Sequence, residues 1–166
     1  MDRLIFVLTL LAALGTGLLA GNFFAFSAYL MRALAGLSAE RGIVAMQAIT
    51  AAIKSLAFLV LFFGTAVLCA VLAGLALLTW GEPGSGYRLA GTLLFLLGAF
   101  PVTMLIHAPL NTRLAVASPD AKEGRDLWKR FLSSWGAWNH VRSLTAFLAC
   151  AALILALAAS GNPFTH

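Results

Sequence analysis

The side chains best suited to chemistry in this sequence gather at the ends of two apolar segments. His107 lies near the end of one segment, and Asn139, His140 and Arg142 lie at the start of the next. A neutral imidazole can take a proton as a general base, and a guanidinium or an amide can stabilise a developing oxyanion. The two histidines are therefore candidates for a general base, or for hydrogen-bonding residues at the membrane interface, beside groups that can donate to an oxygen.

The same residues do not form an obvious metal site. Asp and Glu total six and lie outside the deep apolar runs, so a metal centre is not predicted. Cys69 and Cys150 are not in a Cys-x-x-Cys pair and are expected to be small core residues. We predict no cofactor. Haem held between His107 and His140 is the alternative.

The elements that must position these residues are membrane-spanning helices. Hydrophobic residues make up 61% of the 166-residue chain and charged residues 10%, whereas soluble domains carry about 25% charged residues. A spanning helix needs roughly 20 apolar residues. The stretches that carry no Asp, Glu, Lys or Arg and exceed this length are Leu4–Met31, Ser55–Gly81, Leu89–Thr112 and Ser143–Thr165.

These stretches predict an all-α fold, an antiparallel bundle of four transmembrane helices in a single membrane domain over residues 1–166. The spans are expected at about 4–31, 43–80, 87–108 and 138–160. No run shows the alternation of apolar and polar residues that a transmembrane β-barrel requires. The predicted partner is the lipid bilayer, and nucleic acid is not expected because the basic residues flank apolar spans.

The connections predict how the bundle is arranged. Gly81–Gly86 is a tight turn, and a helix is expected to run from about Ala39 into the second span. Residues 121–138 are predicted to form an amphipathic interfacial helix between spans three and four. Of the Lys and Arg residues, all except Arg3 and Arg88 fall at one end of the bundle. The positive-inside rule then predicts an inner-membrane protein with both termini outside the cytoplasm.

Antiparallel packing brings the polar ends of the four spans to the same membrane face, which predicts a cytoplasm-facing pocket. Gln47, Thr50 and Lys54 share one helical face, and Trp135, Asn139 and Arg142 form a stripe on another. Other interpretations stay open for some of these residues. Lys54, Arg113 and Arg142 could extend to the lipid head groups. Trp128, Trp135 and Trp138 could belong to an interfacial aromatic belt.

Four short motifs, in order along nearly the whole chain, resemble those of the anthrone oxygenase-like family of small four-helix integral membrane proteins. They are G-N-F-F-A-F-S (21–27), G-I-V-A-M-Q-A-I (42–49), A-P-L-N (108–111) followed by Leu114, and W-x-x-W-N-H-V-R (135–142). The resemblance implies a membrane four-helix bundle. It also implies oxidation of a hydrophobic aromatic, anthrone-like molecule by molecular oxygen, as associated with members in polyketide pathways.

The resemblance and the polar pattern together give the predicted site. The expected catalytic residues are His140 as the base, with Arg142 and Asn139. The expected substrate-binding residues are Asn111, His107, Phe26, Ser27, Gln47, Trp135 and Trp138. The sequence departs from the common family pattern at Arg32, Thr50 and His107, so the substrate need not be an anthrone.

Two other functions remain open at the level of the sequence. One is a non-catalytic binding or transport protein for a lipid-like or amphipathic ligand. The other is a structural subunit that associates through small residues such as Gly64 and Gly74, and a homo-oligomer is possible in either case.

Overall fold

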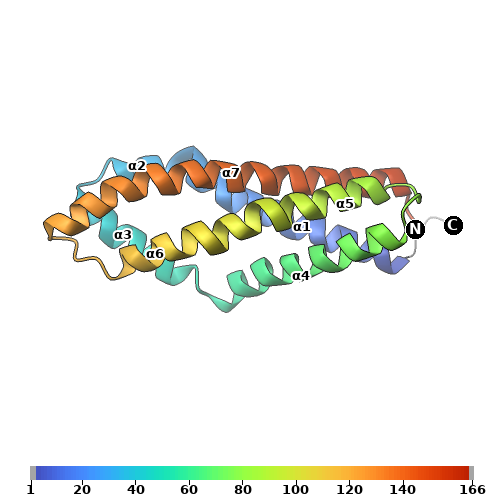
Figure 1. The fold of residues 1–166 in the computed structure, drawn as a ribbon, viewed down its shortest axis with the longest axis horizontal. Helices are drawn as coiled ribbons and strands as arrows, with labels where there is room; N and C mark the ends of the chain where they lie inside the picture. Colours follow the sequence, from blue (N-terminus) through green and yellow to red (C-terminus); the bar gives the residue numbers. More distant parts are fainter. Residues whose placement is uncertain (1–2, 165–166) are drawn as a thin grey trace.

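Helices account for nearly all of residues 3–164, the part of the chain that the computed structural model describes (Figure 1). In chain order they are α1 (Arg3–Ala25), η1 (Phe26–Leu30), α2 (Met31–Ala35), α3 (Ala39–Ala52), α4 (Leu56–Leu78), α5 (Ser85–Leu94), η2 (Phe95–Ala99), η3 (Val102–His107), α6 (Ala108–Ala115) and α7 (Lys122–Ser160). The three η segments are π-helical turns within longer helices. Within the described residues, the helices long and apolar enough to cross a membrane are 3–35, 56–78, 85–115 and 122–160.

These four helices form an antiparallel bundle. Helix α1 packs against α4 and α7, and α5 packs against the same two neighbours. The start of α1 and the end of α7 lie at the same end of the bundle (Figure 1). Large apolar side chains such as Leu18, Val67 and Leu97 cover the outside, as lipid contact requires. The predicted all-α four-helix bundle is confirmed, and the protein is a multi-pass membrane protein.

The second span is interrupted, which the sequence interpretation missed. Helix α3 ends at Ala52 and α4 begins at Leu56, so the prediction of one continuous helix from Ala39 was wrong. Ser55 has an extended backbone and its side chain accepts a hydrogen bond from the amide of Phe58 at 3.4 Å, the arrangement of a helix N-cap. Lys54 lies in the interruption between α3 and α4, and its side chain is exposed.

The third span contains two prolines, and a π-helical turn ends shortly before each of them. One residue, Phe100, separates η2 from Pro101, and one residue, Ala108, separates η3 from Pro109. A proline inside a helix lacks an N–H donor and clashes with the carbonyl four residues before it. A π-turn admits one extra residue and relieves that clash. Because each turn shifts the helical register, it also changes which side chains face the bundle interior.

Helix α7 runs without a break from Lys122 to Ser160. The interfacial helix expected over residues 121–138 therefore begins at Lys122 and forms the first part of the same helix as the fourth span. Its depth in the lipid stays a prediction. Trp128 is buried rather than part of an aromatic belt. It packs so closely on Gly42 that a Cβ there would lie 2.6 Å from the indole ring.

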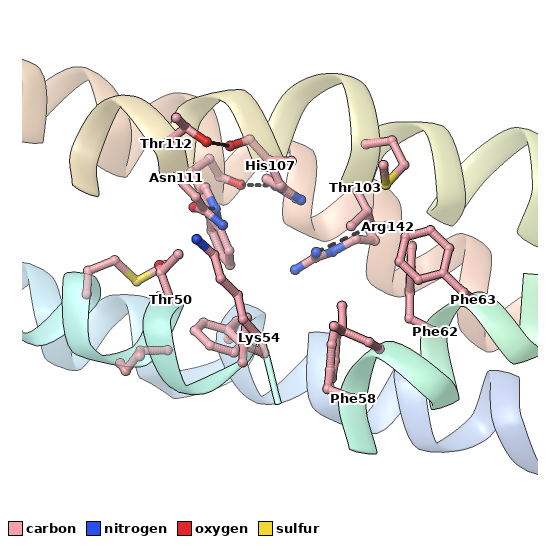
Figure 2. Close-up of a pocket in the computed structure, with 18 residues that line it drawn as sticks. Thr50, Lys54, Phe58, Phe62, Phe63, Thr103, His107, Asn111, Thr112 and Arg142 are labelled. Atoms are coloured by element: carbon pink, nitrogen blue, oxygen red, sulfur yellow. Dashed lines mark hydrogen bonds between the residues drawn. The ribbon is translucent and has the colours of Figure 1, made fainter. Parts of the chain in front are cut away.

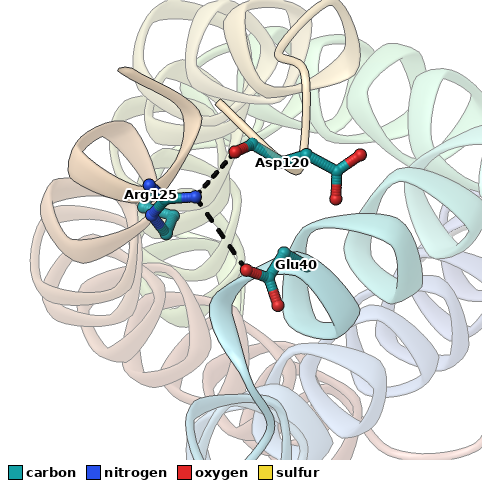
Figure 3. Close-up of polar contacts among 3 residues, drawn as sticks. All are labelled: Glu40, Asp120 and Arg125. Atoms are coloured by element: carbon teal, nitrogen blue, oxygen red, sulfur yellow. Dashed lines mark hydrogen bonds and ion pairs between the residues drawn. The ribbon is translucent and has the colours of Figure 1, made fainter. Parts of the chain in front are cut away.

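A polar contact joins the start of α3 to the start of α7 (Figure 3). The Arg125 guanidinium donates to the carbonyl oxygen of Asp120 at 2.6 Å and lies 3.9 Å from a carboxylate oxygen of Glu40. Exposed ion pairs of this kind contribute about 0–1 kcal/mol. The contact therefore orients the third connection more than it stabilises the bundle.

The buried apolar residues form two separate clusters. The larger one occupies the middle of the bundle and includes Phe23, Phe62 and Phe95. The second lies at the end that carries α3 and α6 and includes Phe26, Ile43, Met46, Trp128 and Trp135. The interruption between α3 and α4 falls where the two clusters meet.

Candidate functional site

A pocket of about 200 Å³ lies between these two clusters. Its apolar wall comes from both clusters and includes Phe26, Met46, Phe62 and Trp135. Its polar lining comes from three parts of the bundle (Figure 2). These polar residues are Thr50 and Lys54 beside the α3–α4 interruption, Thr103, His107, Asn111 and Thr112 from the third span, and Arg142 from α7.

His107 is almost completely buried, with 1% of its surface exposed. Its Nε2 atom lies 3.1 Å from the carbonyl oxygen of Trp135, and the two rings pack with centroids 4.5 Å apart. Because a carbonyl oxygen only accepts, we assign the proton to Nε2. The other nitrogen, Nδ1, then carries a lone pair, and it has no hydrogen-bond partner among the described residues. His107 therefore lines the pocket and carries a buried nitrogen without a hydrogen-bond partner among the described residues.

Arg142 is also buried, and it lines the same pocket. Its guanidinium donates to the amide oxygen of Asn139 at 2.6 and 3.2 Å and to the Thr103 hydroxyl at 3.4 Å. It also stacks over the Phe23 ring, 3.9 Å from the ring centroid. In the described part of the chain its hydrogen-bond partners are all neutral.

Asn139 holds Arg142 from behind the pocket. Its amide nitrogen donates at 2.8 Å to the carbonyl oxygen of Phe23 and at 2.8 Å to the hydroxyl of Ser27. Ser27 lies in the π-turn η1, and Phe23 lies in the last full turns of α1. These bonds tie the first and fourth spans together and fix the position of the guanidinium.

The Trp135 indole lines the pocket and contacts two of its polar residues, His107 and Asn111. Its Nε1 donates to the amide oxygen of Asn111 at 3.0 Å, and its ring lies 5.3 Å from that of Phe26. The structure thus brings together, in or directly behind one pocket, seven of the sequence-predicted residues: Phe26, Ser27, His107, Asn111, Trp135, Asn139 and Arg142.

Three predicted residues lie elsewhere. His140 is exposed and lines a separate groove of about 820 Å³ between α1 and α7, which Ser27 also borders. Trp138 is 42% exposed on the outside of the bundle. Gln47 donates to the carbonyl oxygens of Leu114 and Ala117 at 2.9 and 3.0 Å and so fastens the end of α6. The inference that His140 shares one cavity with His107 and Arg142 does not hold.

This separation also bears on metal and haem binding. His107 and His140 line different cavities, so the arrangement does not offer the two nitrogens to one haem iron. Across residues 3–164, His, Cys, Asp and Glu form no group of three that could hold a metal ion.

The predicted site did not include the pocket residues beside the α3–α4 interruption. Lys54 lines the pocket, as do Phe58 and Phe63 from the first turns of α4. The shared face of Gln47, Thr50 and Lys54 is the signal that pointed there. The sequence alone left Lys54 equally open to an interaction with lipid head groups.

Comparison with known proteins agrees with this picture. The family model described as anthrone oxygenase matches residues 57–152, more than half of the chain. The matched region contains the motifs at 108–111 and 135–142, which supply the pocket residues Ala108, Asn111, Trp135 and Arg142. No curated protein and no solved structure matches the chain significantly. The chain belongs to the anthrone oxygenase family.

Proposed function

We propose that the protein is a membrane-embedded, cofactor-independent oxygenase that acts on a hydrophobic aromatic, anthrone-like molecule in this pocket. The observation that carries the proposal is His107, which lines the pocket together with the buried Arg142 and whose buried Nδ1 atom has no hydrogen-bond partner among the described residues. Membership of the anthrone oxygenase family supports the reaction class. The base is therefore assigned to His107 rather than to His140.

The chemistry requires a carbon acid whose anion reacts directly with oxygen. Nδ1 of His107 removes a benzylic proton, and the electron pair delocalises onto the ring-conjugated carbonyl oxygen. The carbanion forms a C–O bond with molecular oxygen, and the imidazolium protonates the resulting peroxide. Loss of the second benzylic proton cleaves the O–O bond and releases water. One anthrone and one oxygen molecule give one anthraquinone and one water.

Arg142 is the group placed to stabilise the oxyanion. A preorganised cation in a site that excludes water stabilises developing charge more than it would in solution. Asn139 and Thr103 hold the guanidinium in place before substrate binds. Phe26 and Trp135 provide flat apolar surfaces for the substrate rings.

The size of the pocket limits how the substrate is seated. An apolar cavity of about 150 Å³ in another protein accommodates benzene, so 200 Å³ encloses one to two rings. The remaining ring of a larger substrate would extend through the mouth, where Lys54, Leu59 and Phe63 are exposed. The reacting ring would lie inside, next to His107.

The test compares the same substitution at the two histidines. His107→Gln keeps an N–H donor for the Trp135 carbonyl but removes the basic nitrogen. Oxygen consumption with anthrone, above the rate of spontaneous oxidation, is expected to fall about 10²–10⁴-fold. His140→Gln, in the separate groove, is expected to retain the wild-type rate. Melting temperature in detergent shows whether each variant is folded.

Full activity of a folded His107→Gln protein would overturn the assignment of the base, and loss of activity in His140→Gln alone would return it to His140. Saturable binding of anthrone by the wild-type protein without oxygen consumption would favour the alternative function, a non-catalytic binding or transport protein.

For the topology we propose that the pocket end of the bundle faces the cytoplasm of an inner-membrane protein, with both chain ends outside. The third connection and the start of α7 carry Lys122, Arg125, Lys129 and Arg130. The opposite turn, between α4 and α5, contains no Lys or Arg. This asymmetry supports the orientation through the positive-inside rule.

A further inference from the structure

The charge of the pocket is unbalanced. Two cationic side chains, Lys54 and Arg142, belong to its lining, and no Asp or Glu of residues 3–164 does. A ligand that carries negative charge would therefore be attracted to the pocket, and a ligand that carries positive charge would be repelled.

The burial of Arg142 strengthens this asymmetry. Moving a charged group out of water is costly unless an opposite charge accompanies it. The nearest carboxylate along α7 belongs to Asp126, sixteen residues away, or about 24 Å along a helix. Neutral acceptors and the Phe23 ring only partly replace a counter-ion. An anionic oxygen of the bound substrate would complete the site.

A second group of hydrogen-bond donors lies at the other end of the polar lining. The amide oxygen of Asn111 is occupied by the Trp135 indole, and among the described residues its amide nitrogen has no hydrogen-bond partner. Figure 2 shows the Lys54 side chain extending across the pocket toward Asn111. An ammonium and an amide N–H that converge in this way can each donate to one oxygen of a carboxylate.

His107 lies between these two positions. Three pocket residues follow one another at intervals of four along the third span: Thr103, His107 and Asn111. The first of them, Thr103, contacts Arg142. The two ends of this row are roughly 10–12 Å apart along the helix. That length suits a small fused-ring compound with one oxygen substituent at each end.

We propose that the pocket recognises an aromatic carboxylate. Its carboxylate is bound by Lys54 and Asn111, and the oxygen that becomes anionic during reaction is bound by Arg142. The inference rests on the proposed function for the place of the reacting ring beside His107. The binding of the carboxylate itself needs no turnover.

The test uses a matched pair of two-ring probes, 6-hydroxy-2-naphthoate and its methyl ester. Binding is measured by isothermal titration with the full-length protein in nanodiscs of neutral phosphatidylcholine, and empty nanodiscs correct for partitioning into lipid. The acid is expected to bind about 10-fold or more tightly than the ester, as a charge-assisted hydrogen bond allows.

Two charge-removing variants locate the preference. Lys54→Gln is expected to abolish the difference between acid and ester. Arg113→Gln, which removes an exposed cation at the same end of the bundle but outside the pocket, is expected to preserve it. Melting temperatures confirm that both variants are folded.

Equal binding of acid and ester by the wild-type protein would overturn the inference, as would an unchanged preference in Lys54→Gln. Either result could occur while oxygen consumption still depends on His107, which would leave the proposed oxygenase function intact. Conversely, a Lys54-dependent preference without any oxygen consumption would support the carboxylate site and reject the oxygenase.

Discussion

The amide oxygen of Asn139 accepts two hydrogen bonds from the guanidinium of Arg142, three residues further along α7. The amide nitrogen of the same side chain binds the Phe23 carbonyl and the Ser27 hydroxyl of the first span. A single buried amide thus links the packing of two spans to the position of the cation in the pocket. A change at this residue is therefore expected to affect both the packing of the two spans and the position of the guanidinium.

Replacing Asn139 with Leu is expected to lower the free energy of unfolding by about 1–3 kcal/mol, because the buried guanidinium loses its main acceptor. SDS titration followed by circular dichroism measures this change. Thr103→Val removes the 3.4 Å contact to Arg142 and the bond from the Thr103 hydroxyl to the Ala99 carbonyl oxygen at 2.8 Å, but leaves Asn139 bound to the guanidinium. Its effect on the free energy of unfolding is expected to be smaller. Equal stability of Asn139→Leu and wild type would show that Asn139 does not hold the guanidinium in place.

Gly42 is expected to tolerate no larger residue, because a Cβ there would lie 2.6 Å from the buried Trp128 ring. Gly42→Ala should destabilise the protein by about 1–3 kcal/mol through overpacking. Gly136 provides a matched control on α7, since a Cβ there has no neighbour within 4 Å. Gly136→Ala should be neutral or stabilising by up to about 1 kcal/mol. Both values come from the same SDS titration, and a reversed order would contradict the observed packing.

Gln47 is expected to act on the third connection and not on the reacting atoms. Gln47→Leu removes two hydrogen bonds to the carbonyl oxygens of Leu114 and Ala117. Amide hydrogen exchange should become faster in residues 114–121, where the last turn of α6 loses its anchor. Exchange in the middle of α4 serves as the internal reference and should not change. Loss of probe binding without faster exchange would instead place Gln47 in the ligand site.

The orientation can be measured by introducing one cysteine at a time into a protein in which Cys150 is replaced by Ala and the fully buried Cys69 is kept. Gly86→Cys, exposed beside the α4–α5 turn, should react in intact cells with a maleimide that does not cross the membrane. Glu123→Cys, exposed at the start of α7, should react only after the membrane is made permeable. The opposite labelling pattern would invert the proposed topology.

The choice between the two histidines shows how far helical periodicity reaches. Trp135, Asn139 and Arg142 fall on one stripe of α7, and the structure confirms that this stripe faces the interior. His140 is two residues from Arg142, about 200° around the helix. Periodicity therefore already indicated that His140 would point away from the Arg142 side. The predicted site nevertheless groups His140 with the other residues, because the motif at 135–142 contains all of them.

The sequence by itself determined the four apolar spans, their antiparallel order and the end of the bundle where polar side chains collect. Hydropathy and helical periodicity are local properties, so they can be read without knowing which helices touch. Only the tertiary structure decided which polar groups share a cavity. The break beside Lys54 and the π-turns around Pro101 and Pro109 shift the helical register, and the packing of α1 against α7 places His140 outside. These are relationships between segments far apart in the chain, and the position of one base in a pocket depends on all of them.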